Sequence, residues 1–201
     1  MRHHNLLHGR SFIAKWASWT GAVALVGVLT VMGFSSGSIA SSTTKIPACT
    51  TTNLVVWLNT SGSGAAGSTY YRINFTNISA HSCTLTGYPG VSAISQAGIQ
   101  LGDAASRDAA HAVSTVTLTS ARSALGLENS TSRNTATAIL QVTVAENFPI
   151  SACSAITAAG LRVYPPGQKV STVIPYPFVA CLKKGPLFLH VEALQRYVVT
   201  R

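Results

Sequence analysis

Charged residues are scarce in this chain, and acids are the scarcest of them. Asp, Glu, Lys and Arg make up 9% of the 201 residues, and only five of them are acids. A glycosidase with paired carboxylates needs two acids in one cleft, and only Asp103 and Asp108 lie close together in sequence. Surface polarity must therefore come mostly from Ser, Thr and Asn, which is more typical of an extracellular protein than of a cytosolic one.

The chain also has no methionine after residue 32 and no two cysteines close together in sequence. Both methionines, Met1 and Met32, lie in the first 40 residues, so a copper site with a methionine ligand is excluded once that segment is removed. The absence of a C-x-x-C motif argues against a zinc knuckle or a redox site. His81 stands near Cys83, but a disulfide-bonded cysteine cannot act as a thiolate ligand. We therefore expect no metal and no other cofactor.

Hydrolase signatures are absent as well. The chain has no G-x-S-x-G motif, and the S-x-x-K run at 42–45 lacks the S-D-N and K-T-G motifs of penicillin-binding proteins. Asp108 and His111 are close in sequence and serine is plentiful, so an extracellular hydrolase remains the alternative function. The prediction is a protein that is not an enzyme and has no catalytic residues.

The first 40 residues have the parts of a secretory signal peptide. Three basic residues precede an uncharged stretch at 17–34, and small residues follow it. We expect residues 1–40 to be the signal peptide, with cleavage between Ala40 and Ser41, and residues 41–48 to be a short flexible lead. An apolar stretch of this length can also span a bilayer, so an uncleaved signal anchor stays open. The predicted location is extracellular or at the cell envelope.

Four cysteines follow that segment: Cys49, Cys83, Cys153 and Cys181. An even number in an exported chain predicts two disulfides, for which three connectivities are possible. We expect the sequential pairing, Cys49–Cys83 and Cys153–Cys181. Each bond would close a loop of about thirty residues and stabilise the fold by about 3–4 kcal/mol in the chain-entropy model.

Short strand patterns alternate with turn signals along the rest of the chain. In 69–77, Tyr71, Ile73 and Phe75 fall on one face, and polar residues from Tyr70 to Thr76 fall on the other, as in a half-buried strand. Two prolines in 171–177 place that strand at a sheet edge or break it. Segments near 120–129 and 150–160 could each hold a helical turn. About seven to nine short strands predict one antiparallel β-sandwich domain over residues 49–201.

The run from Asn77 to Val91 reads N-x-S-x-x-x-C-T-L-x-G-Y-P-G-V. This run, the second-half motif ITAAGLRVYPPGQ at 156–168 and the order of all four cysteines resemble the secreted actinobacterial domain of unknown function 4232 family. The resemblance covers roughly residues 48–195. It implies an exported or lipid-anchored protein with an immunoglobulin-like β-sandwich, and it favours cysteine pairing within each half. It implies no activity, cofactor or catalytic residue.

The predicted function is a non-catalytic binding or interaction module at the cell envelope. Residues after Ala40 carry eleven Lys or Arg and all five acids, a net charge of +6, which favours an anionic cell-wall polymer or another envelope protein as partner, with solubility alone as the alternative reason. Lys183-Lys184 is the only adjacent basic pair, so nucleic acid is not expected. A membrane is a partner only if the signal segment is retained.

Tyr70 and the loop aromatics Tyr176 and Phe178 are the contact candidates, although Phe178 is expected to pack in the core. A carrier of small ligands is the third candidate function. Sugar could be attached at the N-x-S/T triplets of Asn59, Asn74, Asn77 and Asn129.

Overall fold

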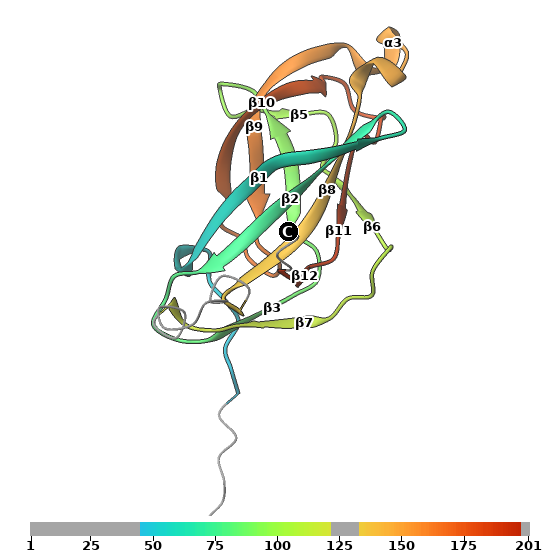
Figure 1. The fold of residues 1–201 in the computed structure, drawn as a ribbon. Coiled ribbons are helices and arrows are strands. Elements are labelled where there is room, and N and C mark those ends of the chain that lie inside the picture. The colour runs from blue at the N-terminus through green and yellow to red at the C-terminus, as the bar shows by residue number, and fades with distance from the viewer. Residues whose placement is uncertain (1–44, 122–132, 198–201) are drawn as a thin grey trace, which may run out of the picture. The chain divides into compact units, whose positions relative to one another are not determined.

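The computed structural model describes residues 45–121 and 133–197, which belong to one compact unit, Thr43–Arg201. The unit is all-β and consistent with a β-sandwich (Figure 1), so the predicted fold class is confirmed at that level. The predicted signal peptide, the cleavage site between Ala40 and Ser41, and Asn129 lie outside the described residues. So does most of the segment at 120–129 that could hold a helical turn.

The described strands form three sheets. The largest has the order β1 (Leu54–Ala65), β2 (Ser68–Asn77), β8 (Thr135–Thr143), β11 (Leu189–Glu192) and β6 (Ser106–Asp108), with β12 (Gln195–Arg196) also paired to β8. The second has the order β10 (Thr172–Cys181), β9 (Ala155–Tyr164), β4 (Gly90–Ile94) and β5 (Gln100–Leu101). The third pairs β3 (Cys83–Thr86) with β7 (Thr115–Leu118).

Two details differ from the sequence prediction. The described residues contain twelve strands rather than seven to nine, because the C-terminal run divides into β11 and β12 and because β6 is too short to leave a pattern. The pairing of β6 with β11 is parallel, whereas the prediction was purely antiparallel. The expected helical turn near 150–160 is the short helix α3 (Ile150–Cys153), and a strand takes over at Ala155. Two 3₁₀ turns, η1 (Thr51–Asn53) and η2 (Ala145–Asn147), complete the described elements.

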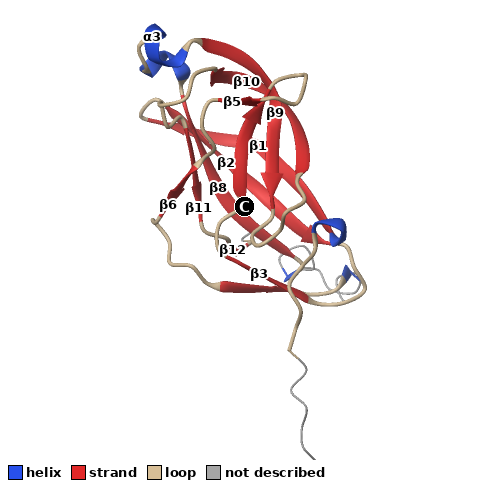
Figure 2. Ribbon diagram, turned by 180° about the vertical axis from the view of Figure 1, so that it is seen from behind, coloured by secondary structure: helices blue, strands red, loops and turns tan. Residues whose placement is uncertain are grey.

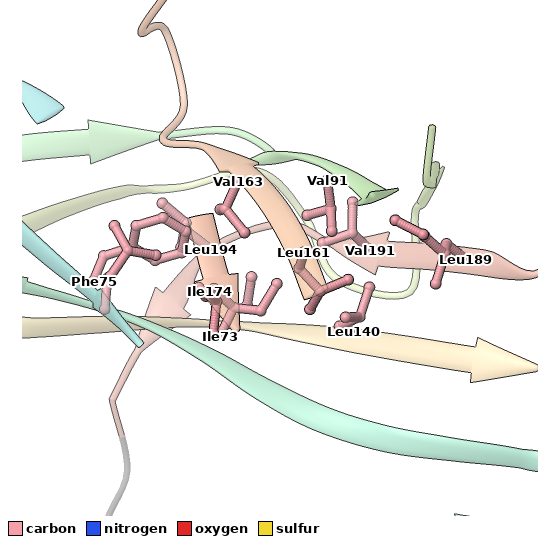
Figure 3. Packing of buried hydrophobic residues seen from close by; sticks show 14 of the residues in the cluster. Ile73, Phe75, Val91, Leu140, Leu161, Val163, Ile174, Leu189, Val191 and Leu194 are labelled. Carbon is pink, nitrogen blue, oxygen red and sulfur yellow. The ribbon is translucent and has the colours of Figure 1, made fainter. Parts of the chain in front are cut away.

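The core lies between the two larger sheets. Ile73 and Phe75 of β2 are fully buried, as their alternation predicts, and Figure 3 shows them among side chains from β4, β8, β9 and β11. Val91 and Leu161 come from the opposite sheet and are also buried. Burying each large aliphatic or aromatic side chain stabilises the fold by about 1.5–3 kcal/mol, so this layer holds the two sheets together.

Two disulfides close the two ends of the sandwich, so the expectation of two disulfides is confirmed. Cys49 is bonded to Cys83 at the start of β3, and Cys153 of α3 is bonded to Cys181 at the end of β10, which is the sequential arrangement. Figures 1 and 2 both place α3 at the end of the molecule opposite to β3 and β7. The first disulfide therefore secures the entry of the chain, and the second secures the α3 end.

The domain begins slightly before Cys49. Residues up to 48 were expected to be flexible, but Ala48 forms a β-bridge with Thr84, and the Pro47 carbonyl accepts a hydrogen bond from the Thr84 N–H at 2.9 Å. The disulfide at Cys49 holds this stretch beside β3, which explains why its last residues are ordered.

Candidate functional site: a basic cleft and an apolar groove

The outer face of the six-stranded sheet carries polar residues from several strands. Because side chains alternate along a strand, the pairing of β2 with β8 places Tyr70 beside Gln141 and Arg72 beside Ile139 on this face. The pairing of β8 with β11 then places His190 beside Gln141. The row of polar residues predicted for β2 is thus continued by neighbouring strands.

A cleft of about 230 Å³ lies on this face. It is lined by Arg72 of β2, Thr137 and Ile139 of β8, Glu192 of β11, Gln195 and Arg196 of β12, and His111. Nδ1 of His111 lies 2.8 Å from a carboxylate oxygen of Glu192, a distance that fits an ion pair when the histidine is protonated, although the contact lacks hydrogen-bond geometry. The one acid in the cleft is therefore engaged by a neighbour.

In the described part of the chain, the side chains of the two arginines in the cleft have no hydrogen-bond acceptor. Among the described residues, the guanidinium groups of Arg72 and Arg196 make no hydrogen bond and no ion pair, whereas that of Arg162 donates to the Gly98 carbonyl at 2.6 Å. Arg72 is half-buried and Arg196 is exposed. Guanidinium groups form paired hydrogen bonds with carboxylates and phosphates, so we call this feature the basic cleft.

Asn74 lies on the same outer face of β2 and differs from its neighbours in being buried. It is on the face that the alternation predicts, but it is fully buried there rather than exposed, next to Trp57 and Thr137 in the strand register. Its Oδ1 accepts a hydrogen bond from Thr137 at 2.7 Å, while its Nδ2 has no acceptor. Its burial removes the amide from reach of a glycosylating enzyme.

The Asp108–His111 pair, from which the hydrolase alternative was built, is not assembled as a triad. Oδ1 of Asp108 accepts from the N–H of Ala110 at 3.0 Å, and His111 turns to Glu192 instead. Asp103, the other half of the close acid pair, accepts from the N–H of Gly185 at 2.8 Å. Both aspartates therefore hold backbone N–H groups in loops.

A different serine and histidine do meet, and sequence reasoning missed them. Nδ1 of His190 lies 2.6 Å from Oγ of Ser106, and Nε2 of His190 donates to the Leu187 carbonyl at 2.9 Å. Since a carbonyl can only accept, Nε2 carries a proton, and the Ser106 hydroxyl lies within reach of both Nδ1 of His190 and the Leu189 carbonyl, the latter at 3.5 Å. The orienting group is a backbone carbonyl rather than a carboxylate, so the pair is a tie between β6 and β11. The two residues are 84 apart in sequence, and only the parallel pairing brings them together.

The α3 end of the sandwich contains a larger, apolar groove of about 600 Å³. Its walls come from η2 with Phe148, from α3, from the start of β9, and from Leu182 after β10. Ile150, Ile156 and Leu182 are exposed, with Ile150 87% accessible. The Cys153–Cys181 disulfide joins two of these walls. No sequence pattern indicated this hollow, because its residues come from four short segments.

A second hollow of about 200 Å³ shares Ala145 and Glu146 with this groove. It runs toward β10, where the ring of Tyr176 lies between Tyr71 and Phe178, at centroid distances of 5.3 and 6.1 Å. The Tyr176 hydroxyl donates to the Tyr71 oxygen at 2.8 Å. Burial, followed by the hydrogen bond and charge repulsion from Tyr71, raises the pKa of Tyr176 to about 12. Tyr176 therefore stays neutral at physiological pH, and Phe178 is half-buried against the core, as expected.

The remaining candidates are structural or solvent-facing. Within residues 45–121 and 133–197, no three His, Cys, Asp or Glu side chains gather where they could hold a metal ion. His81 is exposed, and Cys83 is committed to its disulfide. The same ranges contain no helix with the length and apolarity needed to span a membrane.

The match to a family model covers most of this domain. The model described as domain of unknown function (DUF4232) matches residues 49–191. The chain belongs to this family. No curated protein and no solved structure matches this chain. The DUF4232 match includes all four cysteines and Arg72, whereas Arg196 of the basic cleft lies just beyond it.

Proposed function

We propose that this DUF4232 protein is an exported, non-catalytic binding domain, immunoglobulin-like in architecture, that holds anionic groups of a cell-envelope polymer in the basic cleft. The observation that supports the proposal is the pair of arginines, Arg72 and Arg196, which share one cleft and lack acceptors among the described residues. The two disulfides fit an oxidising compartment outside the cytosol. Removal of residues 1–40 by cleavage before Ser41 is part of the proposal.

The charges of the cleft favour an anion over a cation. Two arginines and one glutamate line the cleft, and the carboxylate of that glutamate is already next to His111. A carboxylate or phosphate of a ligand would therefore find unsatisfied N–H donors, and each charge-assisted hydrogen bond is stronger than one between neutral groups.

The direct experiment measures binding of two defined anionic polymers, polyphosphate and polygalacturonate, by isothermal titration calorimetry. The double variant Arg72→Ala/Arg196→Ala should bind about tenfold or more weakly than the parent protein, because it loses the paired donors. The affinity of the parent should also fall as salt rises from low to physiological concentration, since charge attraction is screened.

The matched control removes two positive charges elsewhere. Lys45 and Lys169 are exposed and lie outside the cleft, so Lys45→Ala/Lys169→Ala has the same net charge as the arginine variant. Equal weakening by both double variants would mean that net charge alone attracts the polymer. That result, or no saturable binding of either polymer by the parent protein, would exclude the basic cleft as the binding site.

A further inference from the structure

The α3 end gathers exposed aliphatic side chains that a water-soluble surface rarely places together. Of the large apolar side chains that are exposed in the described residues, five line the groove or the smaller hollow next to it: Val144, Ile150, Ile156, Val179 and Leu182. Contiguous exposed apolar patches of this kind mark ligand or partner sites. The volume of about 600 Å³ also falls in the range of small-molecule pockets.

The groove has the smaller hollow next to it. Ala145 and Glu146 line both, and Phe178 and Tyr71 line the smaller hollow as well. Two adjoining hollows suit a linear chain, which can reach from one into the other, better than a globular ring system. The disulfide between Cys153 and Cys181 holds the walls in place before any ligand arrives, which reduces the entropy lost on binding.

The lining offers few free polar partners, which favours an alkyl chain over a peptide. Oγ of Ser154 lies 3.4 Å from the Ile150 carbonyl and is used there. The hydroxyl of Thr143 lies 3.3 Å from that of Ser68. A peptide backbone in the groove would leave N–H and C=O groups unsatisfied at a cost of roughly 1–3 kcal/mol each, whereas an alkyl chain has no such groups.

The charges around the groove indicate where a polar head would lie. Nζ of Lys183 donates to the Ser151 carbonyl at 2.9 Å, which holds this ammonium against α3, and Lys184 is exposed beside it. No acid of the described residues pairs with either lysine. Glu146, in contrast, lies where the two hollows meet. An anionic head would be repelled at Glu146 and attracted at the lysine pair.

From these four observations we propose that the groove beside α3 binds one monomeric long-chain fatty acid or a similar single-chain amphiphile, with its alkyl chain in the groove and its anionic head at Lys183 and Lys184. The groove is separate from the basic cleft, so the proposal does not depend on the function proposed above. It would make the domain a carrier of apolar chains as well as a binder of anionic polymers.

Chain length provides the first test. Octanoate, decanoate and dodecanoate, each below its micelle concentration, are titrated into the protein by calorimetry. Affinity should rise about two- to fourfold per added methylene, because each methylene buried in the groove leaves water. Equal affinities for the three acids would overturn the proposal.

Substitutions in exposed residues provide the second test, because they leave the core intact. Ile150→Asp places a charge in the groove wall and should weaken dodecanoate binding at least tenfold. Ile99→Asp is the matched control, since Ile99 is 66% exposed and lies outside the groove. Equal binding by the two variants, with unchanged melting temperatures, would remove the groove as the site.

The position of the anionic head group is tested with a lysine variant and an uncharged analogue. Lys183→Ala/Lys184→Ala should weaken binding of dodecanoate about tenfold and leave binding of dodecan-1-ol almost unaffected, because only the acid carries the charge. An equal loss of affinity for both compounds would overturn the head-group assignment.

Two further measurements test other occupants of the groove. Binding to anionic phospholipid vesicles without saturable binding of dodecanoate would mean that the apolar end docks on a bilayer. Concentration-dependent dimerisation that dodecanoate does not reverse would mean that a second copy covers it. Either of these two results would overturn the proposal.

Discussion

At the scale of single residues, the side chain of Asn77 has a structural role that its sequence context does not suggest. Its triplet with Ser79 reads as a site of sugar attachment, but its side chain is fully buried. Nδ2 donates to the carbonyls of His81 and Thr119 at 2.8 and 2.9 Å, and Oδ1 accepts from the N–H and the hydroxyl of Ser79 at 2.9 and 2.8 Å. The amide thus joins the loop after β2 to the end of β7, and it is not available to a glycosylating enzyme.

Asn77→Asp tests this role with little change in volume. The new carboxylate oxygen would face two backbone carbonyls without a proton to donate, so we expect the free energy of unfolding to fall by about 2–4 kcal/mol. Urea denaturation at pH 7 measures it. The control is Asn59→Asp, because Oδ1 of Asn59 only accepts, from the N–H of Ser61 at 2.9 Å, and an aspartate keeps that bond. If both variants lose the same stability, the buried amide is not the cause.

At the scale of elements, β10 shows how a strand with two prolines is accommodated. It lies at the edge of its sheet, as predicted, and its register with β9 shifts between Pro175 and Phe178. The shift brings its backbone very close to Gly160 of β9. A Cβ there would overlap the Ile174 carbonyl oxygen and lie 3.1 Å from the nitrogen of Tyr176. Glycine at this position is therefore a packing requirement of the irregular strand.

Gly160→Ala should accordingly destabilise the domain by about 1–3 kcal/mol, the usual cost of overpacking, because backbone atoms cannot rotate aside as a side chain can. Gly64→Ala in β1 is a matched control, since the nearest atom to its Cβ is 3.9 Å away. Urea denaturation of both variants measures the difference. A loss at residue 160 no greater than that at residue 64 would show that β10 adapts.

At the scale of the whole molecule, the two disulfides should stabilise the fold by similar amounts, although they lie at opposite ends of the domain. They join residues 34 and 28 apart in sequence. Loops of such similar length predict that either bond stabilises the fold by about 3–4 kcal/mol. The two bonds should differ in their effect on ligand binding, because only Cys153–Cys181 joins walls of the apolar groove.

Replacing each pair with alanine separates these effects. Cys49→Ala/Cys83→Ala and Cys153→Ala/Cys181→Ala should each lower the free energy of unfolding by about 3–4 kcal/mol in urea denaturation. Only the second variant should lose affinity for dodecanoate, when both are measured well below their melting temperatures. Equal affinity in the two variants would mean that the second disulfide does not shape the groove.

The sequence by itself determined the elements whose signals are local. The period-two pattern of β2 identified Ile73 and Phe75 as core residues, because a strand sends alternate side chains to one face. Prolines placed β10 at an edge, because they lack an N–H for a second neighbour. The motif from Asn77 to Val91 and the four cysteines indicated the family.

Only the tertiary structure decided where the candidate sites lie. The basic cleft joins Arg72 to Arg196, and the Ser106–His190 tie depends on the parallel pairing of β6 with β11. The apolar groove similarly needs η2, α3, β9 and the segment after β10 together. Such contacts arise between segments far apart in the chain, and very short strands such as β6 have no periodicity of their own. Packing of the whole sandwich places these segments, so no local pattern in the sequence could reveal the sites.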